Sequence, residues 1–162
     1  ASLPAADRRQ LLAFEEKTGR LQRAVLGAVR AAGEAQTRID HLKKALTDAP
    51  AADPKLADDL RAIEKRLKDV QKELSGDSTV AERNESTPPS IVDRVQQIVG
   101  GHWDATSAPT ATHRRNYEIA ATEFAPVLAK LRALSLTDLK QLEDKAEAAG
   151  APWTPGRVPD WK

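Results

Sequence analysis

Three histidines and many carboxylates are the residue types in this chain that could support acid–base or metal chemistry. His41, His102 and His113 are expected on a helix surface, in a loop and in a first helical turn. They lack the HxxxH or HExxH spacing that places two imidazoles on one metal ion. In the sequence His102-Trp103-Asp104, a carboxylate beside the imidazole would orient its tautomer. No nucleophile is spaced to match, so we interpret this tripeptide as a loop anchor rather than a catalytic site.

The acidic residues follow a pattern typical of solvated helix faces. Neighbouring pairs occur beside Lys and Arg at spacings of three and four residues, at Glu15-Glu16, Asp58-Asp59 and Glu143-Asp144. The repeated Glu-x-x-His pattern of di-iron helical bundles is missing from the sequence. There is no cysteine, which excludes thiolate catalysis and cysteine-ligated zinc. The sequence therefore predicts no catalytic residue, no metal site and no cofactor.

Composition excludes further classes of function. Charged residues make up 30% of the 162 residues, yet the net charge is only +1, so the surface has no basic field for nucleic acid. No apolar run approaches the roughly 20 residues needed to cross a bilayer. Aromatic residues are only 4%, which favours an aliphatic, alanine-rich core between close-packed helices. Because the chain contains no methionine, we interpret it as a fragment of a larger protein or a processed product.

Hydrophobic periodicity and capping residues predict four helices, at about 4–48, 54–75, 90–99 and 110–149. The first helix carries a heptad stripe of apolar and small residues: Leu11, Phe14, Thr18, Leu21, Val25, Ala28, Ala32, Ala35, Ile39, Leu42 and Leu46. Asp53 is expected to cap the second helix at Pro54, and Gly76 to end it. Ser90 is expected to cap the third helix, which Gly100-Gly101 would end.

The last predicted helix contains two irregularities. Its apolar stripe slips by about four residues near Ser135, which indicates a stutter in the heptad pattern. Pro126 removes one backbone hydrogen bond and is expected to kink the helix, at a cost of about 3 kcal/mol unless packing compensates.

The helix lengths predict an all-α fold, an elongated antiparallel bundle in which two long helices bracket two shorter ones. Its middle layer would be broken at the polar linker, where residues 77–89 are expected to form an exposed, extended loop. A compact four-helix arrangement is the alternative. We assign residues 1–149 to the bundle and residues 150–162 to a Pro- and Trp-rich tail.

The tail contains Trp153, Trp161 and three prolines that restrict it to extended geometry. We expect both indoles to dock in grooves between helix ends. The alternative is a tail left free for contact with another part of a larger protein. Trp103 is a further candidate interface residue.

Two stretches, AERNESTPPSIVDRVQQIVGGHWDATSAPTATHRRNYEIAATEFAPVLAKL and AEAAGAPWTPGRVPDWK, resemble the C-terminal region of bacterial sortilin-like BNR-repeat proteins. The resemblance is strongest from about Val80 to Trp161. Members of that family are commonly labelled glycosyl hydrolases and have a large β-propeller portion before a helical end. Their presumed catalytic or ligand-binding residues belong to the propeller, so none is carried onto this sequence.

The resemblance implies a non-catalytic helical accessory domain, located in the periplasm or outside the cell, whose partner is the propeller of its own parent chain. The alternative is an independent helical protein-interaction module of the cell envelope. Self-association through the heptad stripes is a further possibility, although four amphipathic segments can also cover one another within one chain.

Overall fold

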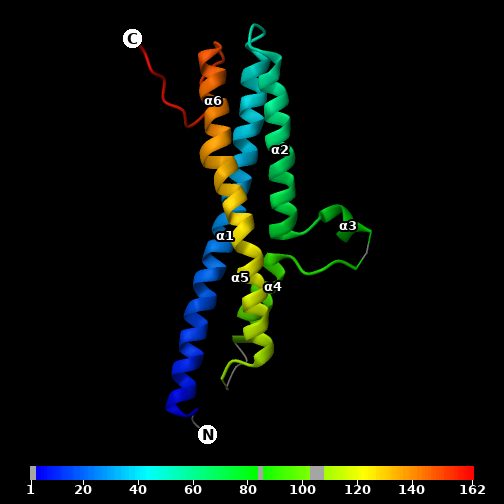
Figure 1. The fold of residues 1–162 in the computed structure, drawn as a ribbon, viewed down its shortest axis with the longest axis vertical. Coiled ribbons are helices and arrows are strands. Elements are labelled where there is room, and N and C mark those ends of the chain that lie inside the picture. Colours follow the sequence, from blue (N-terminus) through cyan, green and yellow to red (C-terminus); the bar gives the residue numbers. More distant parts are fainter. Residues whose placement is uncertain (1–2, 84–85, 103–107) are drawn as a thin grey trace. The chain divides into compact units, whose positions relative to one another are not determined.

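The computed structural model describes residues 3–83, 86–102 and 108–162, and every regular element among them is helical. The elements are α1 (Ala5–Thr47), α2 (Pro54–Ser75), α3 (Ser78–Glu82), α4 (Ile91–His102), α5 (Ala111–Arg132), η1 (Ala133–Asp138) and α6 (Leu139–Ala148). The chain is all-α, as the periodicity predicts (Figure 1).

Local capping explains where most helices begin and end. The Asp53 carboxylate accepts a hydrogen bond from the Lys55 amide at 2.9 Å, and α2 begins at Pro54 as predicted. Gly76, with φ of 86°, follows the last residue of α2. Ser90 and Asp93 exchange two hydrogen bonds of 3.1 Å between side chain and backbone, a reciprocal capping box that confirms the predicted start of α4.

Two predictions about the middle of the chain are wrong. Helix α4 does not end at Gly100-Gly101 but continues through both glycines to His102. A Cβ atom at Gly101 would lie 2.9 Å from the ring of His113, so this glycine makes room for a close side chain instead of ending the helix. The linker, expected to be entirely extended, contains the short helix α3, and the Asp77 carboxylate caps it by accepting from the Thr79 amide at 3.0 Å.

The register slip predicted near Ser135 lies within η1, a stretch of π-helix that joins α5 to α6. The buried residues Leu131 and Leu134 are three positions apart, and the next buried residue is Leu139, five positions further on. A π-turn absorbs this longer step, so apolar residues on both sides of η1 remain in the core. Helix α5 runs through the exposed Pro126.

The chain divides into two compact units. The first unit comprises residues 1–29 and 71–128, and the second comprises residues 30–70 and 129–162. Side chains from α1, α4 and α5 form most of the first core: Phe14, Leu21, Val25, Ala28, Ile91, Val95, Ile98, Ala120, Phe124 and Val127. Thr18 is fully buried among them, and its hydroxyl donates to the Phe14 carbonyl at 2.7 Å. That bond satisfies the polar group within its own helix.

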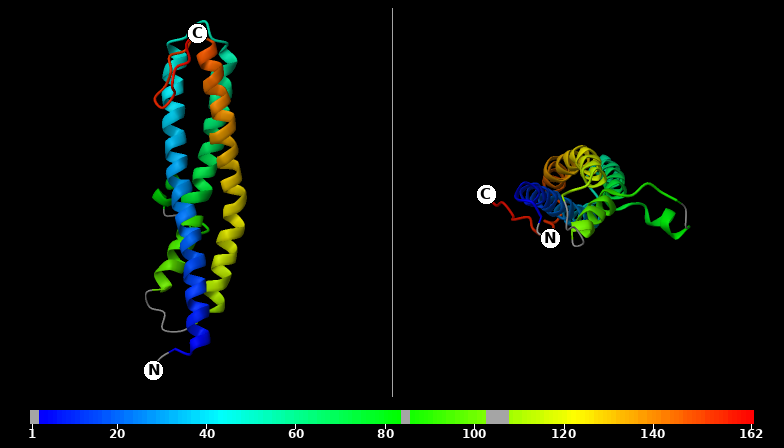
Figure 2. Two further views of the ribbon diagram at one scale, coloured as in Figure 1. Left: turned by 90° about the vertical axis from the view of Figure 1, so that its left-hand side faces the viewer. Right: turned by 90° about the horizontal axis from the view of Figure 1, so that it is seen from below.

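In the second unit, α1 and α2 run in opposite directions beside α6 (Figure 2). Its core residues are Ala32, Ala35, Ile39, Leu42, Ala45, Leu56, Leu60, Ile63, Leu67, Val70, Leu131, Leu134, Leu139, Leu142 and Ala146. Ala45 is buried at the end of the α1 stripe, where the heptad pattern predicted Leu46, which is only half-buried. The small side chains of α1 leave room for close helix packing.

Ion pairs join α1 to α2 and α2 to η1 within the second unit. Lys43 of α1 contacts both carboxylate oxygens of Glu64 on α2, at 2.8 and 2.7 Å. Hydrogen bonds from Lys43 and Gln36 hold the pKa of Glu64 below its usual value. Arg66 of α2 lies 2.7 Å from the Asp138 carboxylate at the end of η1. These pairs align polar edges of the helices around an apolar interior.

Candidate functional site

The tail begins with a Schellman motif at the end of α6. Gly150 has φ of 94°, and its amide donates to the Glu147 carbonyl at 3.1 Å. The Ala151 amide donates to the Ala146 carbonyl at 2.9 Å, and Ala151 is itself buried. Both bonds are made to carbonyls of the last turn of α6, and the glycine makes the left-handed conformation inexpensive. The direction in which the chain leaves α6 is therefore determined by the backbone.

Further along the tail, residues Thr154-Pro155-Gly156-Arg157 form a tight turn. The Arg157 amide donates to the Thr154 carbonyl at 3.0 Å, and Gly156 has φ of 89°. Proline followed by a glycine of positive φ is the pattern of a type II turn. Thr154 is buried, so the turn packs within the second unit.

Arg157 is the main polar anchor of the tail. Its guanidinium makes two hydrogen bonds of 2.7 Å to the Glu147 carboxylate and a further one to Asp144, both on α6. These bonds raise the pKa of Arg157 above its ordinary value. The hydrogen bond from Arg157, followed by the one from Lys140, lowers the pKa of Asp144. A bidentate pair with a half-buried arginine is among the stronger polar contacts available to a protein.

A second arginine network lies beside this turn. Arg38 of α1 pairs with Glu143 on α6, and its Nη1 donates to the carbonyl and hydroxyl of Ser135 at 3.0 and 3.1 Å. Glu143 is only 2% exposed, so the prediction that the Glu143-Asp144 pair lies on a solvated face is wrong for Glu143. Ser135 lies in η1, where the π-turn changes the local hydrogen-bond pattern.

Both networks line a shallow hollow of about 300 Å³ in the second unit. Its walls are formed by Arg38, Ser135, Leu136, Lys140, Glu143, Pro155, Gly156 and Arg157. The cations here already contact carboxylates of α6. The arrangement is therefore suited to holding the tail against α6, and we name residues 151–157 the inner tail.

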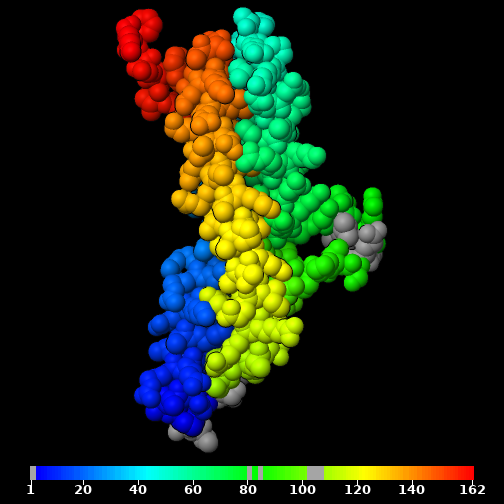
Figure 3. Space-filling model, viewed as in Figure 1, coloured from blue at the N-terminus to red at the C-terminus, as the bar shows by residue number. Residues whose placement is uncertain are grey.

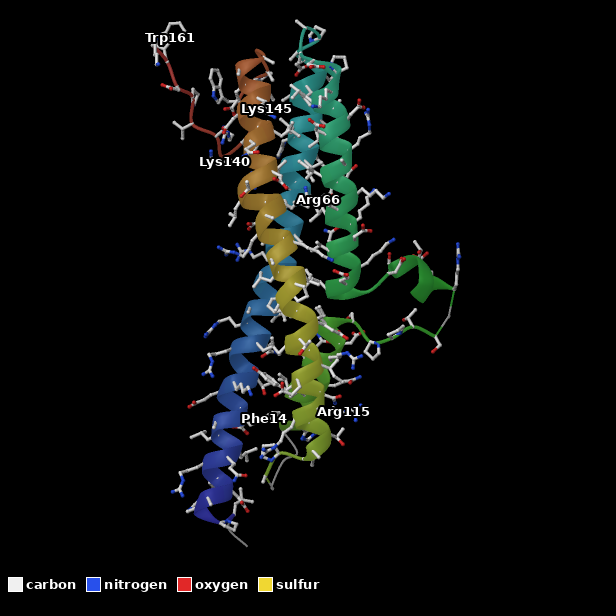
Figure 4. All side chains as sticks on the ribbon, viewed as in Figure 1. Phe14, Arg66, Arg115, Lys140, Lys145 and Trp161 are labelled. Carbon is white, nitrogen blue, oxygen red and sulfur yellow. The ribbon has the colours of Figure 1, made fainter. Side chains whose placement is uncertain are left out.

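Residues 158–162, the outer tail, differ sharply from the inner tail. Val158 is 89% exposed and Trp161 is 92% exposed. Figure 4 shows Trp161 at the free end of the chain, and the tail protrudes from α6 in the space-filling view (Figure 3). The prediction that both indoles dock is wrong for Trp161, and Trp153 is 46% exposed. Arg157, Ala151 and Thr154 hold the tail instead. A bidentate ion pair and a helix cap fix the position of its backbone.

The other predicted site residues are not brought together. His41 is exposed on α1, and His113 lies in the first turn of α5, where its amide donates to the Thr110 hydroxyl at 3.1 Å. Trp103 and Asp104 lie outside the described residues. Within the described ranges, no three His, Asp or Glu side chains are grouped as metal ligands. The same ranges contain no helix with the length and hydropathy of a bilayer span.

Sequence reasoning did not identify Arg157 as a functional residue. A usable signal was present, because Asp144 and Glu147 lie three residues apart on α6 and Arg157 follows a Pro-Gly turn. Such a turn can return an arginine to a pair of carboxylates on the preceding helix.

Comparison of the chain with protein-family models, with curated proteins and with solved structures gives no match.

Proposed function

We propose that this chain is a non-catalytic helical accessory domain that makes protein–protein contacts. The observation that carries the proposal is the outer tail, which displays Val158 and Trp161 to solvent on an anchored base. Tryptophan combines a large apolar area with few rotatable bonds and is enriched among the residues that dominate binding energy at interfaces. An anchored segment also loses less conformational freedom on binding than a free one.

The electrostatics around the inner tail support a structural role for its carboxylates. General acid catalysis at neutral pH requires a carboxyl group whose pKa is raised. The pKa of Asp144 is instead lowered by Arg157 and Lys140, and Glu147 accepts two hydrogen bonds from Arg157. Asp144 therefore stabilises the position of the tail in its ionised form, and Glu147 acts as the bidentate acceptor for Arg157.

The proposed partner is a β-propeller portion of the same parent protein, in the periplasm or outside the cell. This part of the proposal depends on the resemblance between residues 80–161 and the helical ends of sortilin-like BNR-repeat proteins. An independent helical interaction module would use the same outer tail with a different partner.

The test begins with the genomic sequence upstream of the codon for Ala1. An open reading frame that continues into Asp-box repeats supports the proposal, and a frame without them contradicts the propeller partner. The propeller portion, produced separately, should then bind the intact chain in a calorimetric titration. Trp161→Ala should weaken this binding about tenfold or more, as expected for a central interface tryptophan.

The non-catalytic part of the proposal has its own assay. The chain is incubated with a panel of aryl glycosides, and no turnover above the buffer rate is expected. Turnover that disappears when a single Asp or Glu is replaced would contradict the proposal.

A further inference from the structure

A groove of about 390 Å³ in the first unit is lined by residues of α1 and α5: Gln10, Ala13, Phe14, Lys17, Arg114, Tyr117 and Glu118. Ala13 and two aromatic rings form its apolar part, and of the rings Phe14 is largely buried. Phe14 and Tyr117 meet edge to face, with ring centroids 6.1 Å apart. The ammonium group of Lys17 lies 4.3 Å from the centre of the Tyr117 ring. The groove is therefore an aromatic surface with cations at its edge.

The charges on the rim are not balanced. Lys17 lies 3.9 Å from the Glu118 carboxylate, so these two charges are paired. Arg114 donates to the neutral amide oxygen of Gln10 at 3.4 Å and has no carboxylate partner among the described residues. One guanidinium is thus available at the rim for an external carboxylate.

The outer tail has the complementary features. Trp161 and Val158 are its exposed apolar side chains, and Asp160, the residue before Trp161, forms no ion pair within the described part of the chain. Pro159 restricts the backbone to extended geometry. Proline-restricted segments commonly dock in aromatic-lined grooves, because they lose little conformational entropy on binding.

We propose that the groove binds the outer tail of a second copy of this chain. Trp161 packs against the exposed part of the Tyr117 ring, next to the largely buried Phe14, and Asp160 pairs with Arg114. Since the tail and the groove are different surfaces, the contact is heterologous, and repetition of it produces open chains or closed rings. The inference rests on the proposed interaction role of the outer tail, but it does not require the propeller.

This contact should be weak, because five tail residues bury less area than the roughly 1,200 Å² of a stable interface. Sedimentation of the full-length chain should show a weight-average mass that rises with concentration. Trp161→Ala should remove this rise by deleting the indole. Arg114→Asp should also remove it, by placing a carboxylate opposite Asp160. Arg114 is exposed in the first turn of α5, where an acidic residue suits the helix dipole, so this variant should fold.

The decisive experiment mixes the two variants. Trp161→Ala retains the groove and Arg114→Asp retains the tail, so the mixture can form one contact between unlike chains and no second one. An equimolar mixture should therefore give a dimer that does not grow further, whereas each variant alone stays monomeric. A mixture that stays monomeric, or a Trp161→Ala chain that associates like the unmodified one, would overturn the proposal.

Two controls test whether the effect belongs to this contact. Leu26→Ala removes another exposed apolar side chain from α1, one that does not line the groove, and should leave the association unchanged. Combining Arg114→Asp with Asp160→Lys reverses both charges and should restore association that Arg114→Asp alone abolishes. Thermal unfolding monitored by circular dichroism verifies that each variant is folded. If the double variant is folded but monomeric, the proposed ion pair is wrong.

The propeller titration separates this inference from the proposed function. Arg114→Asp should bind the propeller portion as the unmodified chain does, since its outer tail is intact. Propeller binding by a chain that never self-associates would refute the second-copy contact and leave the proposed function in place. Self-association without propeller binding would support the second-copy contact and refute the propeller as the partner. A weight-average mass that does not change with concentration would refute the second-copy contact. This holds even if Trp161 binds the groove of its own chain.

Discussion

The inner and outer tail have similar residue types but different surroundings. Each contains proline and one tryptophan, yet residues 151–157 are anchored to α6, whereas Val158 and Trp161 are almost fully exposed. The difference lies in the backbone turns and in Arg157, which hold only the inner tail. Indole content alone is therefore a poor guide to which part of a tail docks.

The largest effect should come from truncating the chain at different points within the tail. Ending the chain at Gly150 removes the Arg157 ion pairs, the burial of Ala151 and Thr154, and one bond of the helix cap. We expect a loss of about 2 kcal/mol, or about 4–8 °C in the thermal midpoint for a chain of this size. Ending the chain at Arg157 should leave the midpoint unchanged. Equal midpoints for both truncated chains would contradict the division of the tail.

Replacement of Arg157 alone should have the next largest effect. Arg157→Ala leaves the Glu147 carboxylate half-buried without its main donor and should cost about 1–2 kcal/mol in chemical denaturation. Arg157→Lys keeps the charge but loses the bidentate geometry. Its stability should therefore lie between that of the unmodified chain and that of Arg157→Ala. If Arg157→Lys is as stable as the unmodified chain, charge alone anchors the inner tail.

Glycine substitutions compare the turn with an ordinary helix. Gly156→Ala forces a side chain into the positive-φ position of the turn and should destabilise the protein by about 1 kcal/mol. Gly33→Ala is the matched control, because a Cβ atom there meets nothing within 4 Å, and it should stabilise α1 by about 0.5–1 kcal/mol. Effects of the same sign would indicate that the turn is not formed.

The smallest effect is the dependence on pH. The pKa of Asp144 is lowered in the folded protein by Arg157 and Lys140. Its ionised form therefore stabilises the fold at pH values above the pKa that Asp144 has in the unfolded chain. This contribution is lost as the pH falls through the lowered pKa. The stability difference between the unmodified chain and Asp144→Asn should therefore be constant from pH 5 to 7 and shrink below about pH 4. A difference that grows in acid would contradict this account.

Much of the helical fold could be predicted from local signals. Asp53, Gly76 and Ser90 act on residues close in sequence, so their capping roles follow from residue type and position. The end of α4 was mispredicted because the space at Gly101 is used by His113, which belongs to another helix. The resemblance to BNR-repeat proteins gave no information about these contacts.

The candidate site was less accessible to sequence reasoning. Arg38 and Glu143 are 105 positions apart, and nothing in the neighbourhood of either residue indicates the other. The step of five residues from Leu134 to Leu139 was visible only as a register slip, because a heptad analysis does not distinguish a π-turn from a stutter. The partners of Arg157 lie 10 and 13 positions before it, beyond the reach of helical spacing rules.

Hydrogen exchange resolved at single amides by NMR tests the central claim most directly. In dilute solution, the amides of Gly150, Ala151 and Arg157 donate to Glu147, Ala146 and Thr154, and should exchange about tenfold or more slowly than unstructured peptide. The amides of Val158, Asp160 and Trp161 should exchange at the unstructured rate. Uniform protection from Gly150 to Trp161, or uniform exposure, would contradict an anchored inner tail that presents a free outer tail.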